Sequence, residues 1–108
     1  MSGATLQVIS VLAERPTEEH YGLDICRATK LKGGTVYPIL ARLEKEGWVS
    51  SEWEDIDPKL QGRAPRRNYR LTPHGVQLAR EALEAAQRSI WRAWRPAPGV
   101  PQAGGTSA

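Results

Sequence analysis

The stretch GGTVYPILARLEKEGWV, residues 33–49, decides the fold of this 108-residue chain. Apolar residues recur in it at the helical spacing of three and four, at Val36, Leu40, Leu43 and Gly47. This spacing predicts a helix with one buried stripe. The opposite face is small, polar and basic, and carries Thr35, Pro38, Ala41, Arg42 and Lys45. Such a face fits the major groove of DNA, because short side chains let the backbone approach the bases closely.

Two further helices are predicted before this stretch. Apolar residues on more than one face predict a helix over about residues 4–14, packed between its own core and another element. Pro16 ends it. Thr17 then resembles a helix N-cap, which predicts a second helix to about Thr29 that buries Ile25, with Tyr21 and Cys26. Residues 30–34 form the turn into the third helix.

The position of Pro38 leaves two interpretations of the third helix. If the helix starts near Thr35, Pro38 lies among the first positions, whose amides have no partner within the helix. If it starts a turn earlier, Pro38 bends it slightly. In both cases Gly47 ends the helix in a left-handed cap.

The second half of the chain predicts a hairpin and a long helix. Strands over Trp48–Trp53 and Arg67–Leu71 flank a basic loop. The pair Thr72-Pro73 then starts a helix that runs to about Trp94. Its apolar seam has the spacing of a coiled coil and consists of Val76, Ala79, Leu83, Ala86, Ile90 and Ala93. We therefore predict that this helix pairs with a second copy of the chain.

Composition limits the class of protein. The net charge is +3, but residues 25–43 contain no acid, residues 44–57 contain six, and residues 58–72 are again acid-free and basic. This pattern indicates one face that attracts a polyanion, although basic runs are also common on ordinary solvated surface. The sequence shows no membrane span and no secretory signal, and its one cysteine, Cys26, fits a reducing compartment. We expect a cytoplasmic protein with Cys26 as a small hydrophobe of the second helix.

Four motifs resemble the PadR family of bacterial transcriptional regulators. They lie in the family's order over roughly residues 5–80: HYGLDI (20–25), GTVYP (34–38), RLEKEG (42–47) and YRLT (69–72). The wing segment GRAPRR (62–67) is also similar, with Ala64 as an extra residue. The resemblance implies a winged helix-turn-helix, mainly α with a two-stranded β wing, and a long C-terminal dimerisation helix. It also implies a homodimer and a repressor that a small, often aromatic, effector releases from DNA.

The predicted organisation has three parts. Residues 1–72 form the winged helix-turn-helix domain, residues 73–95 the dimerisation helix and residues 96–108 a disordered tail. The residues expected at the dimer contact are Leu6, Ile9, Val76, Ala79, Leu83, Ala86 and Ile90.

The predicted DNA contacts come from three places. The third helix supplies Thr35, Tyr37, Pro38 and Arg42, of which Arg42 is the expected base reader because a guanidinium can bond guanine at two acceptors. Tyr37 is equally open to a packing role in which only its hydroxyl reaches out. Phosphate contacts are expected at the start of the helix from Lys30 and Lys32. In the wing, contacts with the DNA backbone or the minor groove are expected from Arg63, Arg66 and Arg67.

Two tryptophans near the chain's end, Trp91 and Trp94, form the candidate ligand site. In a two-fold dimer their indoles could flank a cavity for a flat aromatic effector, or they could be plain interface packing. Trp48 and Trp53 are expected to be structural. His20, His74 and Cys26 lack metal-ligand spacing, and no nucleophile–base pattern occurs, so neither a metal, a cofactor nor an enzyme is expected.

The sequence thus predicts a DNA-binding regulator acting as a homodimer on a palindromic operator of double-stranded DNA. Two alternatives stay open, a winged-helix protein-interaction module and a ligand sensor without specific DNA readout. The acid-free surface of the second and third helices argues against the first of these alternatives.

Overall fold

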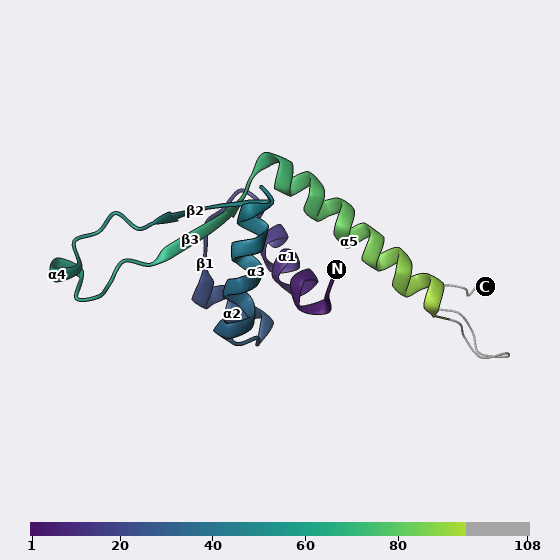
Figure 1. The fold of residues 1–108 in the computed structure, drawn as a ribbon, viewed down its shortest axis with the longest axis horizontal. Coiled ribbons are helices and arrows are strands. Elements are labelled where there is room, and N and C mark those ends of the chain that lie inside the picture. Colours follow the sequence, from purple (N-terminus) through teal and green to yellow (C-terminus); the bar gives the residue numbers. More distant parts are fainter. Residues whose placement is uncertain (95–108) are drawn as a thin grey trace, which may run out of the picture.

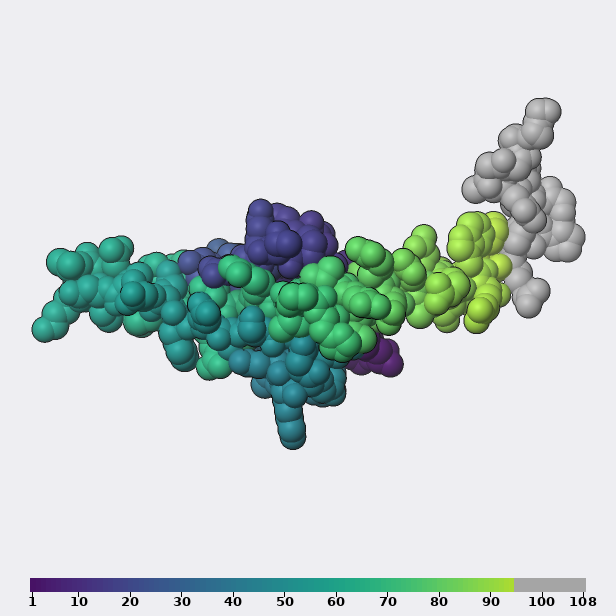
Figure 2. Space-filling model, turned by 90° about the horizontal axis from the view of Figure 1, so that it is seen from above, coloured from purple at the N-terminus to yellow at the C-terminus, as the bar shows by residue number. Residues whose placement is uncertain are grey.

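A computed structural model describes residues 1–94, in which three short helices form a body and two long arms leave it in opposite directions (Figure 1). The body contains α1 (Gly3–Glu14), α2 (Gly22–Thr29) and α3 (Gly33–Lys45). One arm is a hairpin of β2 (Val49–Trp53) and β3 (Arg67–Leu71), and the other is α5 (Pro73–Ala93). The molecule is accordingly elongated, 66 × 27 × 26 Å (Figure 2). The predicted tail, residues 96–108, lies outside the described residues.

The core of the body is formed where α1, α2 and α3 meet. Its fully buried side chains include Val8, Ile9 and Leu12 from α1, Ile25 from α2 and Leu40 from α3. The α1 helix also packs against α5, so it lies between the core and another helix, as its apolar faces predicted. Burying a large aliphatic side chain is worth roughly 1.5–3 kcal/mol, so this cluster is the main source of stability.

The predicted start of the second helix was wrong. Thr17 lies in a turn, closed by the bond from the Glu18 amide to the Arg15 carbonyl (3.0 Å), and α2 begins only at Gly22. The residues between form a short strand, β1 (His20–Tyr21), which pairs antiparallel with β3. The sheet therefore has three strands in the order β1-β3-β2 rather than the two predicted. Pairing with a strand from the second half of the chain overrode the local capping signal.

The hairpin arm follows the prediction closely. β3 spans Arg67–Leu71, and the register pairs Val49 with Leu71 and Trp53 with Arg67. The intervening loop carries one turn of helix, α4 (Pro58–Gln61), which was not predicted. Asp57 is its N-cap residue and accepts a bond from the Lys59 amide, and Gly62 is its C-cap residue with a φ of 68°. Figure 1 shows α4 at the far end of the arm.

The last helix begins where the sequence predicted. Thr72 caps it by accepting a bond from the Gly75 amide (2.8 Å), and Pro73 occupies its first turn. Thr72 also donates its amide to the Trp48 carbonyl (3.0 Å), which joins the start of α5 to the segment between α3 and β2. We call this contact between Trp48, Thr72 and Gly75 the Trp48 joint.

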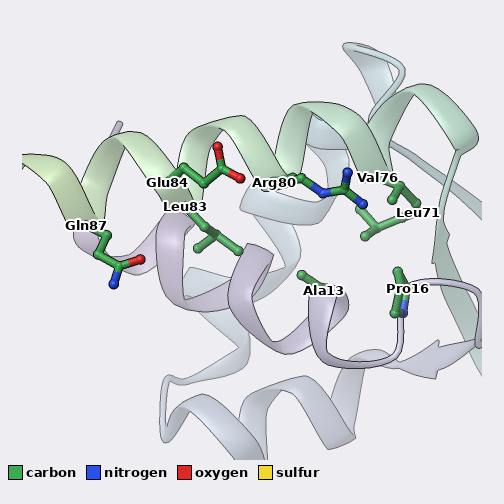
Figure 3. A pocket seen from close by; sticks show the side chains of 8 residues that line it. All are labelled: Ala13, Pro16, Leu71, Val76, Arg80, Leu83, Glu84 and Gln87. Carbon is green, nitrogen blue, oxygen red and sulfur yellow. The ribbon is translucent and has the colours of Figure 1, made fainter.

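The first half of α5 lies along α1, and the second half projects beyond the body (Figure 1). Val76 and Leu83 pack partly buried against the core, and a cavity of about 250 Å³ remains beside them between α5 and the end of α1 (Figure 3). Two residues assigned to the dimer contact, Ile9 and Ala79, are almost completely buried within one chain. They belong to its own core, so that part of the assignment needs correction.

Candidate nucleic-acid interface

The exposed face of α3 is the one that the sequence predicted. Val36, Leu40 and Leu43 are buried, at 1% exposure or less. The residues on the opposite side are exposed to solvent: Thr35, Pro38, Ala41, Arg42 and Lys45. The helix starts at Gly33, so Pro38 lies in its second turn, where its missing amide removes one bond to Gly34. Pro38 therefore lies on the exposed face and leaves α3 without one internal hydrogen bond.

Two lysines flank the start of α3. Lys30 ends α2 in a left-handed conformation, with a φ of 61°, and Lys32 is the N-cap residue of α3. Both are exposed, and neither forms an ion pair within residues 1–94. The first amides of a helix lack partners and favour an anion, and two unpaired lysines beside them add to that preference. The structure therefore brings together the elements of a phosphate contact here.

Arg42 lies at the edge of α3 that faces α1. Its Nη2 donates a hydrogen bond to Oγ1 of Thr5 (2.9 Å), and the Thr5 hydroxyl also bonds the hydroxyl of Ser2 (2.8 Å). The guanidinium has no carboxylate partner within residues 1–94. To read a base, Arg42 would exchange this one charge-assisted hydrogen bond, which contributes about 1.5–3 kcal/mol, for bonds to the base.

Tyr37 lies on the other edge of α3, toward the hairpin. Its ring packs against the backbone of Gly22 and Gly33, because a Cβ at Gly22 would lie only 2.4 Å from its Cε1 atom and one at Gly33 only 3.2 Å from its Cε2 atom. The side chain is nevertheless 44% exposed. Both roles predicted for Tyr37, packing and an outward-facing group, are thus compatible with this position.

The wing is held together by a carboxylate. Glu54 accepts two hydrogen bonds from the Arg63 guanidinium (2.6 and 3.0 Å), one from the Arg66 amide (2.8 Å) and one from the Tyr21 hydroxyl (3.1 Å). We call these four residues the Glu54 cluster. Because Tyr21 belongs to β1, the cluster ties the loop of the wing to the body. Within this cluster the Arg63 guanidinium is paired with the Glu54 carboxylate, although the sequence predicted that Arg63 contacts DNA.

Arg67 is similarly engaged. Its Nε donates to the Ser51 hydroxyl (2.9 Å), its Nη2 lies 3.5 Å from Glu44 Oε1, and its guanidinium lies 5.4 Å from the centre of the Trp53 ring. The Glu44 carboxylate belongs to α3, so Arg67 connects the wing to α3. Its expected DNA contact therefore competes with contacts inside the chain.

Arg66 is the wing arginine whose charge is unmatched. Its guanidinium lies 5.6 Å from the centre of the Tyr21 ring, within the range of a cation–π contact, and forms no ion pair within residues 1–94. The sequence alone makes Arg63, Arg66 and Arg67 equivalent. The structure separates them, because only Arg66 of the three keeps its charge free for an external anion.

The Glu54 cluster has a pH dependence that can be measured. The hydrogen bonds from Arg63 lower the pKa of Glu54 most, desolvation opposes them, and the bonds from the Arg66 amide and Tyr21 lower it further, so that it falls from 4.5 to about 2. A lowered pKa in the folded state stabilises the fold above pH 4.5, and the contribution is lost as the pH falls toward 2. We expect E54Q to melt below the wild type at pH 7 and to match it near pH 2.

The control for this experiment is E52Q. Glu52 is an exposed carboxylate on β2 that forms no ion pair within residues 1–94. The melting temperature of E52Q, measured by circular dichroism, should equal that of the wild type at both pH values. An E54Q protein that melts with the wild type at pH 7 would show that the cluster contributes nothing to stability.

The residues predicted for a dimer or a ligand lie on α5 and α1. Leu6, Ala86 and Ile90 line one groove of about 500 Å³ between the start of α1 and the second half of α5. Trp91 and Trp94 lie beyond it at the free end of the helix, 61% and 47% exposed, with their rings 5.5 Å apart in an edge-to-face arrangement. No helix within residues 1–94 is long and apolar enough to cross a membrane.

Comparison with known proteins identifies the group to which this architecture belongs. The profile of the transcriptional regulator PadR-like family matches residues 8–81, which run from within α1 through the rest of the body and the wing to the first half of α5. The chain belongs to the PadR-like family. This match confirms the resemblance seen in the four sequence motifs. It also confirms the predicted winged-helix fold and the prediction of a DNA-binding protein that regulates transcription.

Individual PadR-like relatives agree with this assignment. Transcriptional regulator Rv3488 of Mycobacterium tuberculosis is 42% identical over 64 residues, which cover 56% of this chain and 55% of the relative. The chain thus spans about half the length of that protein. A crystal structure of a PadR family regulator from Eggerthella lenta superimposes with a TM-score of 0.62 at 29% identity, covering 79% of this chain and 74% of the other.

A more distant structure shares the fold alone. BpsR of Bordetella bronchiseptica has a TM-score of 0.70 at 19% identity, over 95% of this chain and 66% of its own. DNA binding by BpsR is regulated by 6-hydroxynicotinic acid.

Proposed function

We propose that this PadR-like protein is a homodimeric repressor that binds a palindromic DNA operator. The observation that carries the proposal is the exposed face of α3, which is small and polar between two basic regions, Lys30 with Lys32 at its start and Arg66 in the wing. One α3 from each subunit would enter successive major grooves, about one helical turn apart. Occupying a promoter in this way would block transcription.

The exposed apolar surface of α1 and α5 supports the dimer. The groove beside Leu6 is lined mainly by apolar residues, and Ile90 is 71% exposed at its end. Val76, Leu83, Ala86 and Ile90 repeat at coiled-coil spacing along the same helix. A large apolar side chain that projects on an isolated helix is best accounted for by a partner surface, and a second copy of this chain offers the matching groove.

An effector would act through this dimer. Trp91 and Trp94 of both subunits could flank a space that accepts a flat aromatic molecule, since aromatic rings prefer offset or edge-to-face neighbours. Binding there would release DNA only if the molecule prefers a dimer arrangement that fits the operator poorly. The regulation of BpsR by an aromatic acid provides a precedent within the fold, at 19% identity.

The test of the proposal is binding to the DNA upstream of the protein's own gene across a salt series. A specific regulator should prefer this DNA to a random duplex of equal length by about a thousandfold. Its affinity should also fall steeply as salt rises, because phosphate contacts release counterions. Equal affinity for both duplexes with a steep slope would indicate nonspecific binding, and no binding to either would favour a protein-interaction module or a ligand sensor.

A substitution at Arg42 tests base recognition. We expect R42A to weaken binding to the operator by about ten- to a hundredfold and binding to random DNA much less, since a two-point contact with guanine contributes roughly 1–3 kcal/mol of discrimination. Fluorescence anisotropy with both duplexes measures this difference. R15A is the matched control, because Arg15 is an exposed arginine after α1 whose partner is Glu18. Equal losses on both duplexes would make Arg42 a phosphate contact.

A further inference from the structure

A hollow of about 480 Å³ lies between the start of α2, one edge of α3 and the wing. We call it the wing hollow. Elements that are distant in sequence contribute to its wall, which includes Tyr21, Leu23, Tyr37, Trp53, Arg66 and Tyr69. It is separate from the groove that Leu6, Ala86 and Ile90 line, and neither Trp91 nor Trp94 lines any part of it.

The wall of the wing hollow is unusually aromatic for a protein surface. All three of the chain's tyrosines and one of its four tryptophans face it. Trp53 is 63% exposed and Tyr37 is 44% exposed, so both rings are available to a ligand. Tyr69 also lines the hollow but is buried, and this burial raises the pKa of its hydroxyl. Rings arranged around a hollow of this kind favour stacking with a flat molecule.

The charge of the wing hollow is positive. Glu54 is matched by Arg63, and Glu44 by Arg67, so each of these carboxylates near the wall has its own cation. Arg66 is left without a carboxylate partner within residues 1–94, above the ring of Tyr21. The local surplus is therefore one positive charge, carried by a guanidinium that can bond two oxygens of a carboxylate or a phosphate.

We propose that the wing hollow binds a planar aromatic anion, whose ring stacks against Trp53 and Tyr37 and whose charged group pairs with Arg66. The inference rests on the proposed DNA-binding function, because Tyr37 and Arg66 also belong to the DNA-facing surface. A ligand in the hollow would occupy the space between α3 and the wing that the operator needs. It would thus compete with DNA directly, without any change in the arrangement of the dimer.

Calorimetric titration of the DNA-free protein tests the site itself. The probes are 2-naphthoate and adenosine 5′-monophosphate, which carry a carboxylate and a phosphate on a planar ring and so distinguish the two kinds of anionic group. We expect at least one of them to bind. Its neutral or non-aromatic counterparts, 2-naphthamide, adenosine and cyclohexanecarboxylate, should bind about tenfold more weakly or not at all, since each lacks a charge-assisted bond or a stacking ring. Binding by neither probe, or equal binding of the counterparts, would overturn the proposal.

Paired variants then locate the site. R66Q and W53A should each weaken binding of the active probe by about tenfold. R70Q is the matched control, because Arg70 points to the other face of β3 and pairs with Glu19. Both Trp53 and Arg66 are exposed, so we expect these variants to fold, which circular dichroism checks. A loss of binding in W91A or W94A, with R66Q and W53A unaffected, would place the ligand on α5 and contradict the inference.

Competition with DNA separates the ligand site from the proposed function. If the probe excludes DNA, the apparent dissociation constant for the operator rises in proportion to probe concentration without a plateau. An effector acting through the dimer produces a plateau at its coupling factor instead. Because the calorimetric experiment contains no DNA, a protein that binds the probe but no operator would refute the proposed function and leave the site standing.

Discussion

Alanine in place of Gly75 is expected to lower the free energy of unfolding by about 3 kcal/mol, the upper end for overpacking a rigid site. A Cβ at this position would lie 1.8 Å from the carbonyl oxygen of Trp48 and 2.7 Å from its carbonyl carbon. These are backbone atoms, held by the amide of Thr72, so no side chain can rotate to make room. To relieve the clash, either α5 must move away from Trp48, or the Trp48 backbone and the start of β2 must move away from α5. Chemical denaturation followed by circular dichroism measures the effect.

The control for Gly75 is the same substitution at Gly3. A Cβ there would meet nothing within 4 Å, although Gly3 also lies in the first turn of a helix. Alanine is the better helix former, so G3A should be neutral or slightly stabilising, by a few tenths of a kcal/mol and at most about 1. If G75A were as stable as G3A, the result would contradict the close packing of α5 against the Trp48 backbone.

Aspartate in place of Ile90 is expected to dissociate the proposed dimer and reduce operator affinity by about a hundredfold or more. The substitution introduces a charge into the apolar seam of α5, at a residue that is 71% exposed in the single chain and therefore contributes little to its own fold. A monomer keeps one α3 and one wing, and loses the gain in effective concentration from the second half-site, which is typically about 10²–10⁴-fold. Sedimentation velocity and anisotropy together measure both effects.

Gln77 provides the matched control on the same helix. It is exposed and lies on the side of α5 opposite the seam, so Q77D introduces the same charge without touching the proposed contact. Its sedimentation and operator affinity should equal those of the wild type. An I90D protein that stays dimeric would show that the dimer uses another surface, and a monomeric I90D with full operator affinity would show that DNA binding needs no dimer.

Local signals predicted the parts of the fold that depend on local chemistry. The stripe of Val36, Leu40 and Leu43 is buried as its spacing required, and the Thr72-Pro73 pair starts α5 at the predicted residue. β3 also has the predicted bounds. In each case the local signal, periodicity or a capping residue, agrees with the tertiary contacts. The amino-acid sequence alone was therefore sufficient to predict these elements.

The prediction failed where distant contacts decide the outcome. Thr17 carries a capping hydroxyl, but His20 and Tyr21 gain more from pairing with β3, so the helix starts later. Ile9 and Ala79 have the spacing of a dimer contact, yet the fold of one chain already buries them. The wing arginines differ because Glu54 pairs with Arg63 and Glu44 pairs with Arg67, and the sequence shows both carboxylates only as members of an acidic run.

The Trp48 joint has a consequence for the choice of operator. The Trp48 amide bonds the Leu43 carbonyl at the end of α3, its own carbonyl accepts from Thr72, and β2 begins at the next residue. The α3 helix, the wing and α5 therefore meet within a few bonds, with no flexible linker between them. A 21-residue helix is about 30 Å long, so a tilt of about 10° at its base displaces the far end by roughly 5 Å. In the proposed dimer this one angle sets the distance between the two α3 helices, and hence the number of base pairs between half-sites.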